Sequence, residues 1–541
     1  MSPPRTGINL SAGVVGMSEP VRRRHVWRYV LGVALVLVGI AGVAAGIFAR
    51  HLTPIVRQRA LDMLRSRFDS EAEIRDLQVS VLQGITVKGS GLTLHYRGRT
   101  DIPPLIEIRE FSGNMGWTSL IHKPWHIRKI EIAGLTIQVP PKEERGTGNA
   151  PGFSLKGRDV PVLVDELLAD NSELDLIPSD PKKATHQFLI HSLHMHGVGL
   201  NQPASFTANL TNAAPPGTII TQGHFGPWQG EDPGQTPLAA NYTFEDANLG
   251  VFHGISGILS SKGKFGGVLE DIDVRGETDT PDFAISIAGH HMLLHTDFEA
   301  TVDGTNGNTL LHPVIAQFLH TTLVCNGGVV KAEGRNGREV ILDVSTDHAR
   351  LEDLLRLAVK SDQPIMTGAI KLMTKFDLPP GPGEIVDRLR LDGKFGVGGA
   401  EFANAEIREK LKGLSRRGLG KPEDADAGSA VSELRGSFRL DNGQITFREL
   451  RFGVTGATVQ LAGTYGLRDE KLDFHGQLRL QAKLSQVTTG VKSLLLKPFD
   501  SFFRRNGVTV LPIKVTGTRE QPSFGLDFHH KKEDSKGVEG D

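Results

Sequence analysis

Two groups of histidine are the side chains in this chain best suited to chemistry. They are His186, His191, His194 and His196 in the first group, and His290, His291 and His295 in the second. His194 and His196 would share one face of a strand, where two imidazoles could ligate zinc. Leu193 and Met195 would then occupy the other face. The simpler interpretation is an amphipathic strand with its histidines in solvent, so we predict no metal ion.

Motifs for catalysis are missing from the sequence. It contains no HExxH, no Gly-x-Ser-x-Gly and no phosphate-binding Gly-x-x-x-x-Gly-Lys-Ser/Thr motif. Cys325, the single cysteine, cannot form an intramolecular disulfide, and we expect a buried, inert thiol. The chain is therefore predicted to be a non-enzyme that needs no cofactor.

Alternation of apolar and polar residues is the dominant pattern. Between Leu472 and Leu484 it continues for thirteen positions, broken only by Gly476. A period of two places the apolar residues on one face of a strand. The same pattern recurs upstream, and together these segments supply nine residues for one apolar face: Phe438, Leu440, Val459, Leu461, Leu472, Phe474, Leu478, Leu480 and Leu484.

Turn residues separate these runs every 8 to 14 positions, which favours antiparallel meanders over parallel βαβ units. Asn442-Gly443 is the dipeptide preferred by a tight type I′ hairpin. Short amphipathic helices are predicted at 350–358 and 404–414, the second with a basic opposite face. A third candidate, 491–503, could cap the sheet or lie in a membrane interface. The predicted fold is mainly β: an elongated antiparallel meander or groove with few helices.

Residues 30–49 form a run with no charged or polar side chain, long enough as a helix to cross the hydrocarbon of a bilayer. Its larger apolar residues are Val30, Leu35, Leu37, Ile40, Ile47 and Phe48. The compact basic cluster at 22–28 favours a cytoplasmic N-terminus. A cleaved signal peptide is the alternative, but the run is longer than a usual signal core, so we favour an uncleaved anchor.

Composition excludes one class of partner. With 61 Lys and Arg against 62 Asp and Glu, the formal net charge is −1, so a nucleic-acid partner is not expected. The 63 Gly and 29 Pro indicate a turn-rich chain. At 541 residues, several domains or one elongated repetitive sheet are expected.

Sequence stretches near both ends of the chain resemble one known protein family. The matching stretches near the C-terminus are LRGSFRLDNGQITFRELRF (434–452), TGATVQLAGTYGLRDEKLDFHGQLRL (455–480) and LPIKVTGTREQPSFGLDF (511–528). Near the N-terminus, one apolar helix followed at once by strands is also typical of the family. These stretches resemble the AsmA-like family of bacterial envelope proteins, which has larger relatives such as TamB and YhdP and is similar to chorein-type bridge-like lipid transfer proteins.

The resemblance implies a single-pass protein of the bacterial inner membrane with its large domain in the periplasm. It implies a groove that binds phospholipid or another acyl-chain ligand and assists phospholipid transport or outer-membrane homeostasis, with outer-membrane components as further partners. The nine apolar residues above would line that groove, provided that the apolar faces stay unpaired. About twenty strands would extend roughly 100 Å. The alternative is a non-enzymatic assembly factor or scaffold for outer-membrane protein biogenesis.

The expected organisation has seven parts. These are a cytoplasmic basic tail (1–29), a transmembrane anchor (30–49), an N-terminal AsmA-like β region (50–140), a central β-rich region (141–345), a helix-containing connecting region (346–433), a C-terminal AsmA-like β region (434–528) and a disordered tail (529–541).

Overall fold

The fold is known from a computed structural model. It describes residues between 53 and 527, apart from 59, 63, 65–70, 82–83, 96–102, 121–124, 140–161, 177–185, 200–201, 230–231, 333–336, 362, 423–430 and 488–499. In these residues no helix is long and apolar enough to cross a membrane. The predicted anchor at 30–49 and tail at 529–541 lie outside them.

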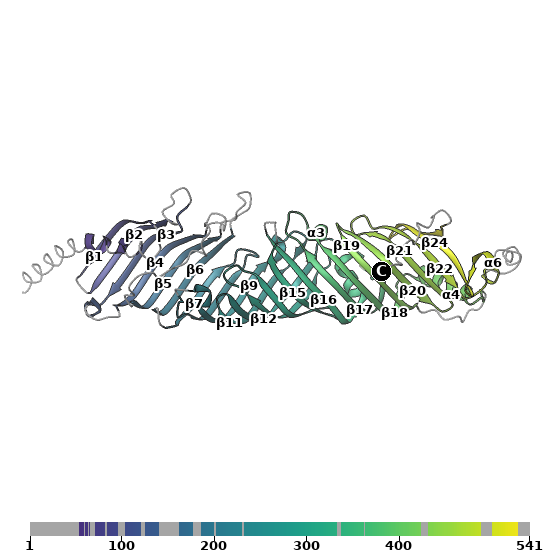
Figure 1. Ribbon diagram of the computed structural model, residues 1–541, viewed down its shortest axis with the longest axis horizontal. Helices are drawn as coiled ribbons and strands as arrows, with labels where there is room; N and C mark the ends of the chain where they lie inside the picture. Colours follow the sequence, from purple (N-terminus) through teal and green to yellow (C-terminus); the bar gives the residue numbers. More distant parts are fainter. Residues whose placement is uncertain are drawn as a thin grey trace, which may run out of the picture.

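One elongated sheet of 25 strands forms almost the whole described molecule (Figure 1). Strands that follow one another in sequence are neighbours in the sheet, so the predicted meander is confirmed. The short β10 and β23 are exceptions, since they pair at the margin of β12 and β24. β1 and β25 each pair on one side only among the described strands. The sheet is therefore open at both ends.

The strands are short in relation to the length of the sheet. In the N-terminal half they are β1 (Glu71–Ser80), β2 (Ile85–His95), β3 (Ile106–Met115), β4 (Trp125–Val139), β5 (Val162–Leu176), β6 (His186–Gly199), β7 (Ala204–Thr211), β8 (Thr218–Phe225), β9 (Pro237–Asn248), β10 (Ile255–Ser256), β11 (Ile258–Val268) and β12 (Asp271–Ile285).

The C-terminal half continues in the same way. Its strands are β13 (Met292–Val302), β14 (Thr309–Phe318), β15 (Thr321–Lys331), β16 (Arg338–Arg350), β17 (Met366–Leu378), β18 (Arg390–Phe402), β19 (Val431–Asp441), β20 (Gln444–Val454), β21 (Ala457–Gly466), β22 (Lys471–Leu480), β23 (Arg504–Arg505), β24 (Val508–Thr518) and β25 (Pro522–Leu526). The sheet crosses the expected divisions at 345/346 and 433/434, which fall inside β16 and β19.

Helices are few in the described residues. They are the α-helices α2 (Leu351–Ala358), α3 (Ile385–Arg388), α4 (Ala405–Gly418) and α6 (Asp500–Phe503), and the 3-10 helices η2 (Trp117–Leu120), η4 (Pro233–Gln235), η5 (Leu249–Val251) and η6 (Leu484–Gln486). α2 and α4 agree with the helices predicted at 350–358 and 404–414. Of the third candidate, only α6 is described.

Local sequence explains several of these boundaries. Asn442 and Gly443 both have positive φ, as the two central residues of a type I′ turn require, and they join β19 to β20. The side chain of Asn404 accepts hydrogen bonds from the backbone N–H groups of Glu406 and Ile407, which caps α4. Both features follow from the residue types at those positions.

One strand pair departs from the predicted antiparallel pattern. β4 and β5 run parallel, with Trp125 opposite Val162 and Val139 opposite Leu176. The connection between them has 22 residues (140–161), whereas the tight turns elsewhere need only a few. A connection of that length is long enough to return to the edge of the sheet at which β4 begins. The alternation of residues within a strand does not predict whether the next strand runs parallel or antiparallel.

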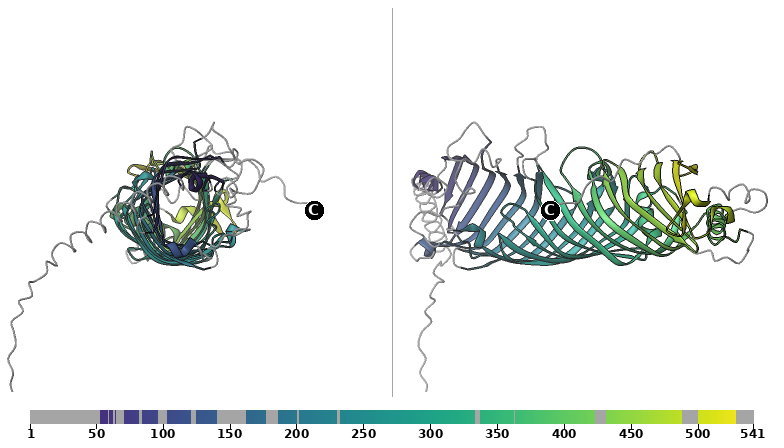
Figure 2. Two further views of the ribbon diagram at one scale, coloured as in Figure 1. Left: turned by 90° about the vertical axis from the view of Figure 1, so that its left-hand side faces the viewer. Right: turned by 45° about the vertical axis from the view of Figure 1, so that its right-hand side comes forward.

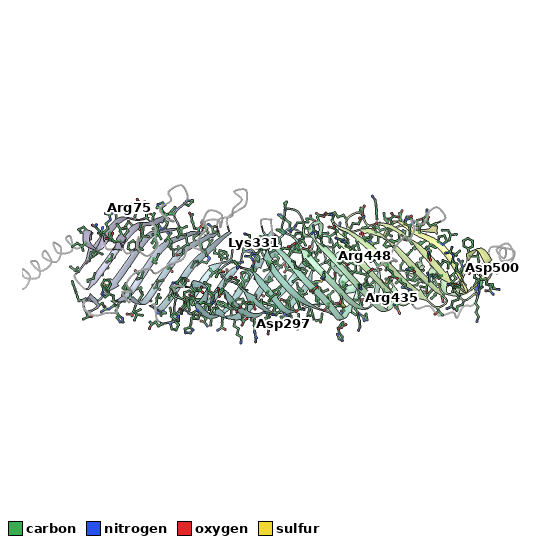
Figure 3. All side chains as sticks on the ribbon, viewed as in Figure 1. Arg75, Asp297, Lys331, Arg435, Arg448 and Asp500 are labelled. Atoms are coloured by element: carbon green, nitrogen blue, oxygen red, sulfur yellow. The ribbon has the colours of Figure 1, made fainter. Side chains whose placement is uncertain are left out.

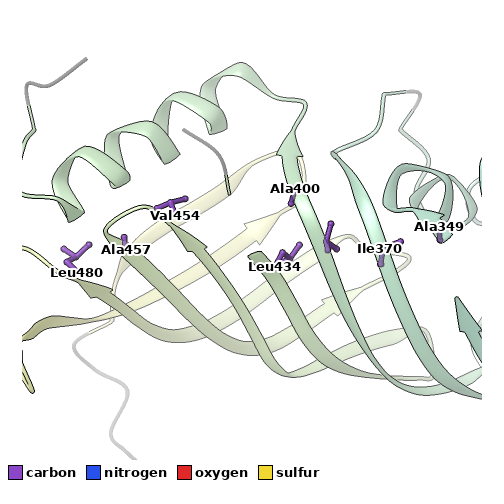
Figure 4. Close-up of a cluster of buried hydrophobic side chains, with 8 residues drawn as sticks. Ala349, Ile370, Ala400, Leu434, Val454, Ala457 and Leu480 are labelled. Atoms are coloured by element: carbon purple, nitrogen blue, oxygen red, sulfur yellow. The ribbon is translucent and has the colours of Figure 1, made fainter. Parts of the chain in front are cut away.

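The sheet curls along its length into a trough (Figure 2). At its C-terminal part a cluster of eight buried residues lies near the ends of the strands: Ala349, Ile370, Val397, Ala400, Leu434, Val454, Ala457 and Leu480. Leu351 and Leu354 of α2 and Leu411 and Leu414 of α4 pack against it. Figure 4 shows the labelled members in a row between the sheet and the helical segments. The two helices therefore cover part of the trough.

The outer face of the sheet carries charge. Arg448 and Asp392 form an ion pair of 2.7 Å on this face, and the bond from Arg448 lowers the pKa of the Asp392 carboxyl. Charged side chains surround the ribbon, as the labelled Arg435 and Arg448 illustrate (Figure 3). Exposed pairs of this kind contribute little to stability. These charged side chains keep the outer face hydrated, whereas the inner face is apolar.

We predict that Gly476→Val weakens the sheet locally. A Cβ atom at Gly476, in the centre of β22, would overlap the backbone oxygen of Gln460 on β21. Overpacking of this kind costs about 2 kcal/mol. Hydrogen exchange read by mass spectrometry should show faster opening of β21 and β22. Gly396→Ala is the matched control, because a Cβ there has no atom within 4 Å. Equal protection in the two variants would contradict the prediction.

Candidate functional site

The trough contains a cavity of about 1430 Å³ in its C-terminal part. Its wall is built from the inner faces of β17 to β22, β24 and β25 and from one side of α2 and α4. Most of the side chains in this wall are aliphatic or aromatic. The cavity is open rather than sealed, so the inner faces of these strands do not close against one another.

Six of the nine residues predicted for one apolar face lie in the wall of this cavity. They are Phe438, Val459, Leu461, Leu472, Phe474 and Leu478. Val459 and Leu461 come from β21, and Phe474 from β22, and these three form a buried cluster. The period of two therefore identified the inward face of these strands correctly.

Three of the nine lie elsewhere. Leu480 is 1% exposed and belongs to the buried cluster at the strand ends, against which Leu411 and Leu414 of α4 pack. Leu484 does not continue β22: the strand ends at Leu480, and Leu484 begins the 3-10 helix η6. Placing Leu484 in a groove was an extrapolation of the alternation beyond the end of the strand, so that placement is wrong.

Leu440 is buried at the opposite edge of the sheet. It stands opposite Leu391 and Ile445, next to the turn that ends β19. α3 closes this edge, since Arg468, just after β21, pairs with Glu384 at 2.7 Å and with Asp387 at 2.8 Å. Alternation gives the face of a residue, but not its position between the middle and the end of the strand.

Aromatic residues that the sequence did not single out complete the wall. Phe395 of β18 lies with its ring centroid 6.2 Å from that of Phe438 and 6.4 Å from that of Phe447. Phe447 lies 5.7 Å from Phe474. These separations are typical of favourable aromatic pairs. Phe395 was missed because it stands in a glycine-rich segment, LDGKFGVGG, where alternation is weak.

α2 reaches the cavity because buried polar contacts hold it on the sheet. The Asp353 carboxylate accepts hydrogen bonds of 2.9 Å from the backbone N–H of His320 and from the Thr321 hydroxyl. Gly368 N–H donates to Glu352 at 3.1 Å. With one side of the helix fixed in this way, the apolar stripe that includes Leu351 and Leu354 turns toward the cavity.

The histidine groups do not form a metal site in the part of the chain that the structure describes. His191, His194 and His196 are exposed on β6, as the amphipathic-strand interpretation predicts. His290 contacts the Val359 carbonyl oxygen at 3.1 Å, and His295 contacts Asp279 at 2.7 Å.

Each of the three histidines of the second group has a partner of its own. The third, His291, contacts the Asp282 carbonyl oxygen at 3.0 Å. His186 begins β6, and its side chain is outside the described set.

Cys325 lies on β15, half-buried. Burial raises the pKa of its thiol, which disfavours the thiolate that a nucleophile needs. This agrees with the expected inert thiol, although the residue is less buried than predicted.

The end wall of the cavity is the short strand β25, which contributes Pro522, Phe524 and Gly525. Directly after it, the Asp527 carboxylate contacts His475 Nδ1 at 2.6 Å, and His475 Nε2 lies 3.1 Å from Asp473. The hydrogen bond to Asp527 is the main cause of a raised pKa for His475, and Asp473 adds to it. His475 thus holds the end of β25 across β24.

Comparison with protein-family models, with curated proteins and with solved structures finds no match. The resemblance to AsmA-like proteins therefore remains a prediction from the sequence stretches quoted above.

We predict that the attachment of β25 depends on pH. Because the folded-state pKa of His475 is raised above its unfolded value of about 6.5, the stabilisation is fully present below that value. It is lost as the pH rises through the folded pKa. Hydrogen exchange of β25, corrected for intrinsic rates, should show more protection in the wild type than in Asp527→Asn at pH 6. The difference should shrink at pH 9. A difference that does not depend on pH would show that the His475 charge is not involved.

Proposed function

We propose that this chain is a membrane-anchored periplasmic carrier whose trough binds the acyl chains of phospholipids. In this role it assists phospholipid transport or outer-membrane homeostasis, and it is not an enzyme. The observation that carries the proposal is the open apolar cavity between the inner face of the sheet and helices α2 and α4. An apolar surface of this size left open to water is unfavourable unless a ligand covers it.

The chemistry of acyl chains fits this cavity. Exposing a chain to water costs about 0.8 kcal/mol per methylene, so a carrier must offer a continuous apolar wall. Pockets for compact ligands usually measure about 300–1000 Å³, and this cavity of about 1430 Å³ is larger. The rings of Phe395, Phe438, Phe447 and Phe474 supply flat apolar surface along the wall. A flexible hydrocarbon can follow such a wall without specific hydrogen bonds.

The location is part of the same proposal. The apolar run 30–49 would anchor the chain in the bacterial inner membrane with its N-terminus in the cytoplasm, and the sheet would extend into the periplasm. The partners would be the inner membrane, the phospholipid itself and outer-membrane components. The length and one-sided polarity of the sheet support a carrier over part of that distance, since neighbouring strands are about 4.8 Å apart.

A second candidate function is an assembly factor or scaffold for outer-membrane proteins. The observation in its favour is the edge of β25, which pairs only with β24 among the described strands. Phe524 and Leu526 of this strand are 59% and 49% exposed. An extended segment of a client protein could add to such an edge through main-chain hydrogen bonds.

A charged substitution in the wall tests the carrier function. We expect Leu478→Asp to reduce binding of a fluorescent acyl-chain phospholipid by about tenfold or more, because a carboxylate in an apolar wall must be desolvated. Binding would be measured by native gel with the full-length chain. Met373→Asp is the matched control, since Met373 is 72% exposed on the outer face, next to the cavity residue Leu372.

Two results would count against the carrier. One is unchanged lipid binding in a Leu478→Asp chain whose circular dichroism matches the wild type. The other is equal loss in Leu478→Asp and Met373→Asp, which would place the ligand away from the cavity.

A further inference from the structure

Charge around the cavity is concentrated on one element. All the charged residues of its wall except Lys514 come from α4: Glu406, Glu409, Lys410, Arg416 and Arg417. Over its whole length α4 carries five cations and two carboxylates. The helix therefore places an excess of positive charge directly beside an apolar cavity.

Most charges of α4 are neutralised or bonded within the helix region. Lys410 pairs with Glu406 at 2.7 Å, and Lys412 pairs with Glu409 at 2.8 Å. Arg408 donates to the carbonyl oxygens of Phe402 and Ala403 at 2.8 and 2.6 Å. Both carboxylates of the helix thus already have a cationic partner.

Arg416 and Arg417 are left without such partners. Neither guanidinium forms an ion pair or a side-chain hydrogen bond with any residue that the structure describes. The pKa of Glu409 is lowered mainly by Lys412, and Arg416 adds only a smaller electrostatic effect. The Nε of Arg416 is buried and unsatisfied, which is unfavourable for a donor of this kind. Two cations near a helix C-terminus interact well with the helix dipole. The dipole accounts for the position of these charges but supplies no anionic partner for them.

We propose that Arg416 and Arg417 bind the phosphate of a phospholipid whose acyl chains occupy the cavity. This inference rests on the proposed function above. Guanidinium groups donate several hydrogen bonds in a fixed fork that matches phosphate oxygens, and both arginines line the cavity. The apolar wall formed by residues such as Phe447 and Leu461 would receive the chains at the same time. α4 then acts as the polar margin of an amphiphile site.

The sharpest test compares two probes that differ only in the phosphate. Dioleoyl phosphatidic acid and dioleoylglycerol have the same acyl chains, and binding to the full-length chain can be measured by native mass spectrometry. We expect the wild type to bind the phosphatidic acid about tenfold more tightly, consistent with charged hydrogen bonds. In Arg416→Gln/Arg417→Gln the ratio should fall toward one, while binding of dioleoylglycerol stays within about twofold.

A matched control removes a cation of the same helix. Lys412→Gln deletes a charge already paired with Glu409 and should keep the tenfold preference within about a factor of two. Inorganic phosphate at millimolar concentration should not displace the phosphatidic acid, because a free ion lacks the acyl chains. Complete displacement would assign the arginines to free phosphate instead.

The outcomes separate the two proposals. If the wild type binds both lipids equally, or if the double variant keeps the preference, the phosphate site is wrong and the acyl-chain cavity stands. If the wild type binds neither lipid, the carrier function itself fails, and the phosphate site fails with it.

Discussion

The structure depends on an imbalance between the apolar face of one long sheet and the few elements that cover it. A sheet with one apolar face normally buries it against a second layer. Here the described second layer at the C-terminal part consists mainly of α2 and α4, whose apolar side chains pack against the cluster at the strand ends and line one side of the cavity. The middle of the strands, with Phe447, Leu461 and Phe474, remains beside open space. Backbone pairing continues the sheet from strand to strand, so the trough can extend without a closed core.

Curvature is what turns this imbalance into a trough. Register shifts occur in successive strand pairs from β12 to β18, at Thr280/Phe283, Asp297/Ala300, Leu311/Val314, Thr322/Val324, Thr346/Ala349 and Thr367/Ala369. An extra residue in one strand bends it and increases its twist. Irregularities repeated in neighbouring strands bend the sheet in a consistent direction. The inner faces of the strands then border one common space, whereas in a flat sheet each would be exposed to solvent.

Much of this could be predicted from sequence because the signals are local. Alternation fixed the inward face of β21 and β22, Asn442-Gly443 fixed a hairpin, and Asn404 marked the start of α4. Contacts between distant segments could not be predicted in this way. Arg468 pairs with Glu384 and Asp387, far away in the sequence, beside the edge where Leu440 lies, and η6 begins at Leu484 where the alternation would continue β22. The parallel pairing of β4 with β5 depends on a connection without periodicity. Periodicity describes one strand at a time, and each of these features involves two or more elements.

α4 has apolar residues that contact the sheet and, in its last turn, arginines that lie beside the cavity. Leu411 and Leu414 hold the helix on the sheet, and Ser415 donates a hydrogen bond of 2.8 Å to the Thr455 carbonyl oxygen at the β20–β21 turn. These contacts hold the last turn of the helix, which carries Arg416 and Arg417, beside the cavity. A charged group held beside an apolar space raises the free energy when it has no partner. A partner of opposite charge offsets this cost and must fit the geometry of the group. If the chain carries a phospholipid as proposed, the same packing that holds α4 on the sheet would favour an anionic head group, because an uncharged hydrocarbon would leave the two arginines without a partner.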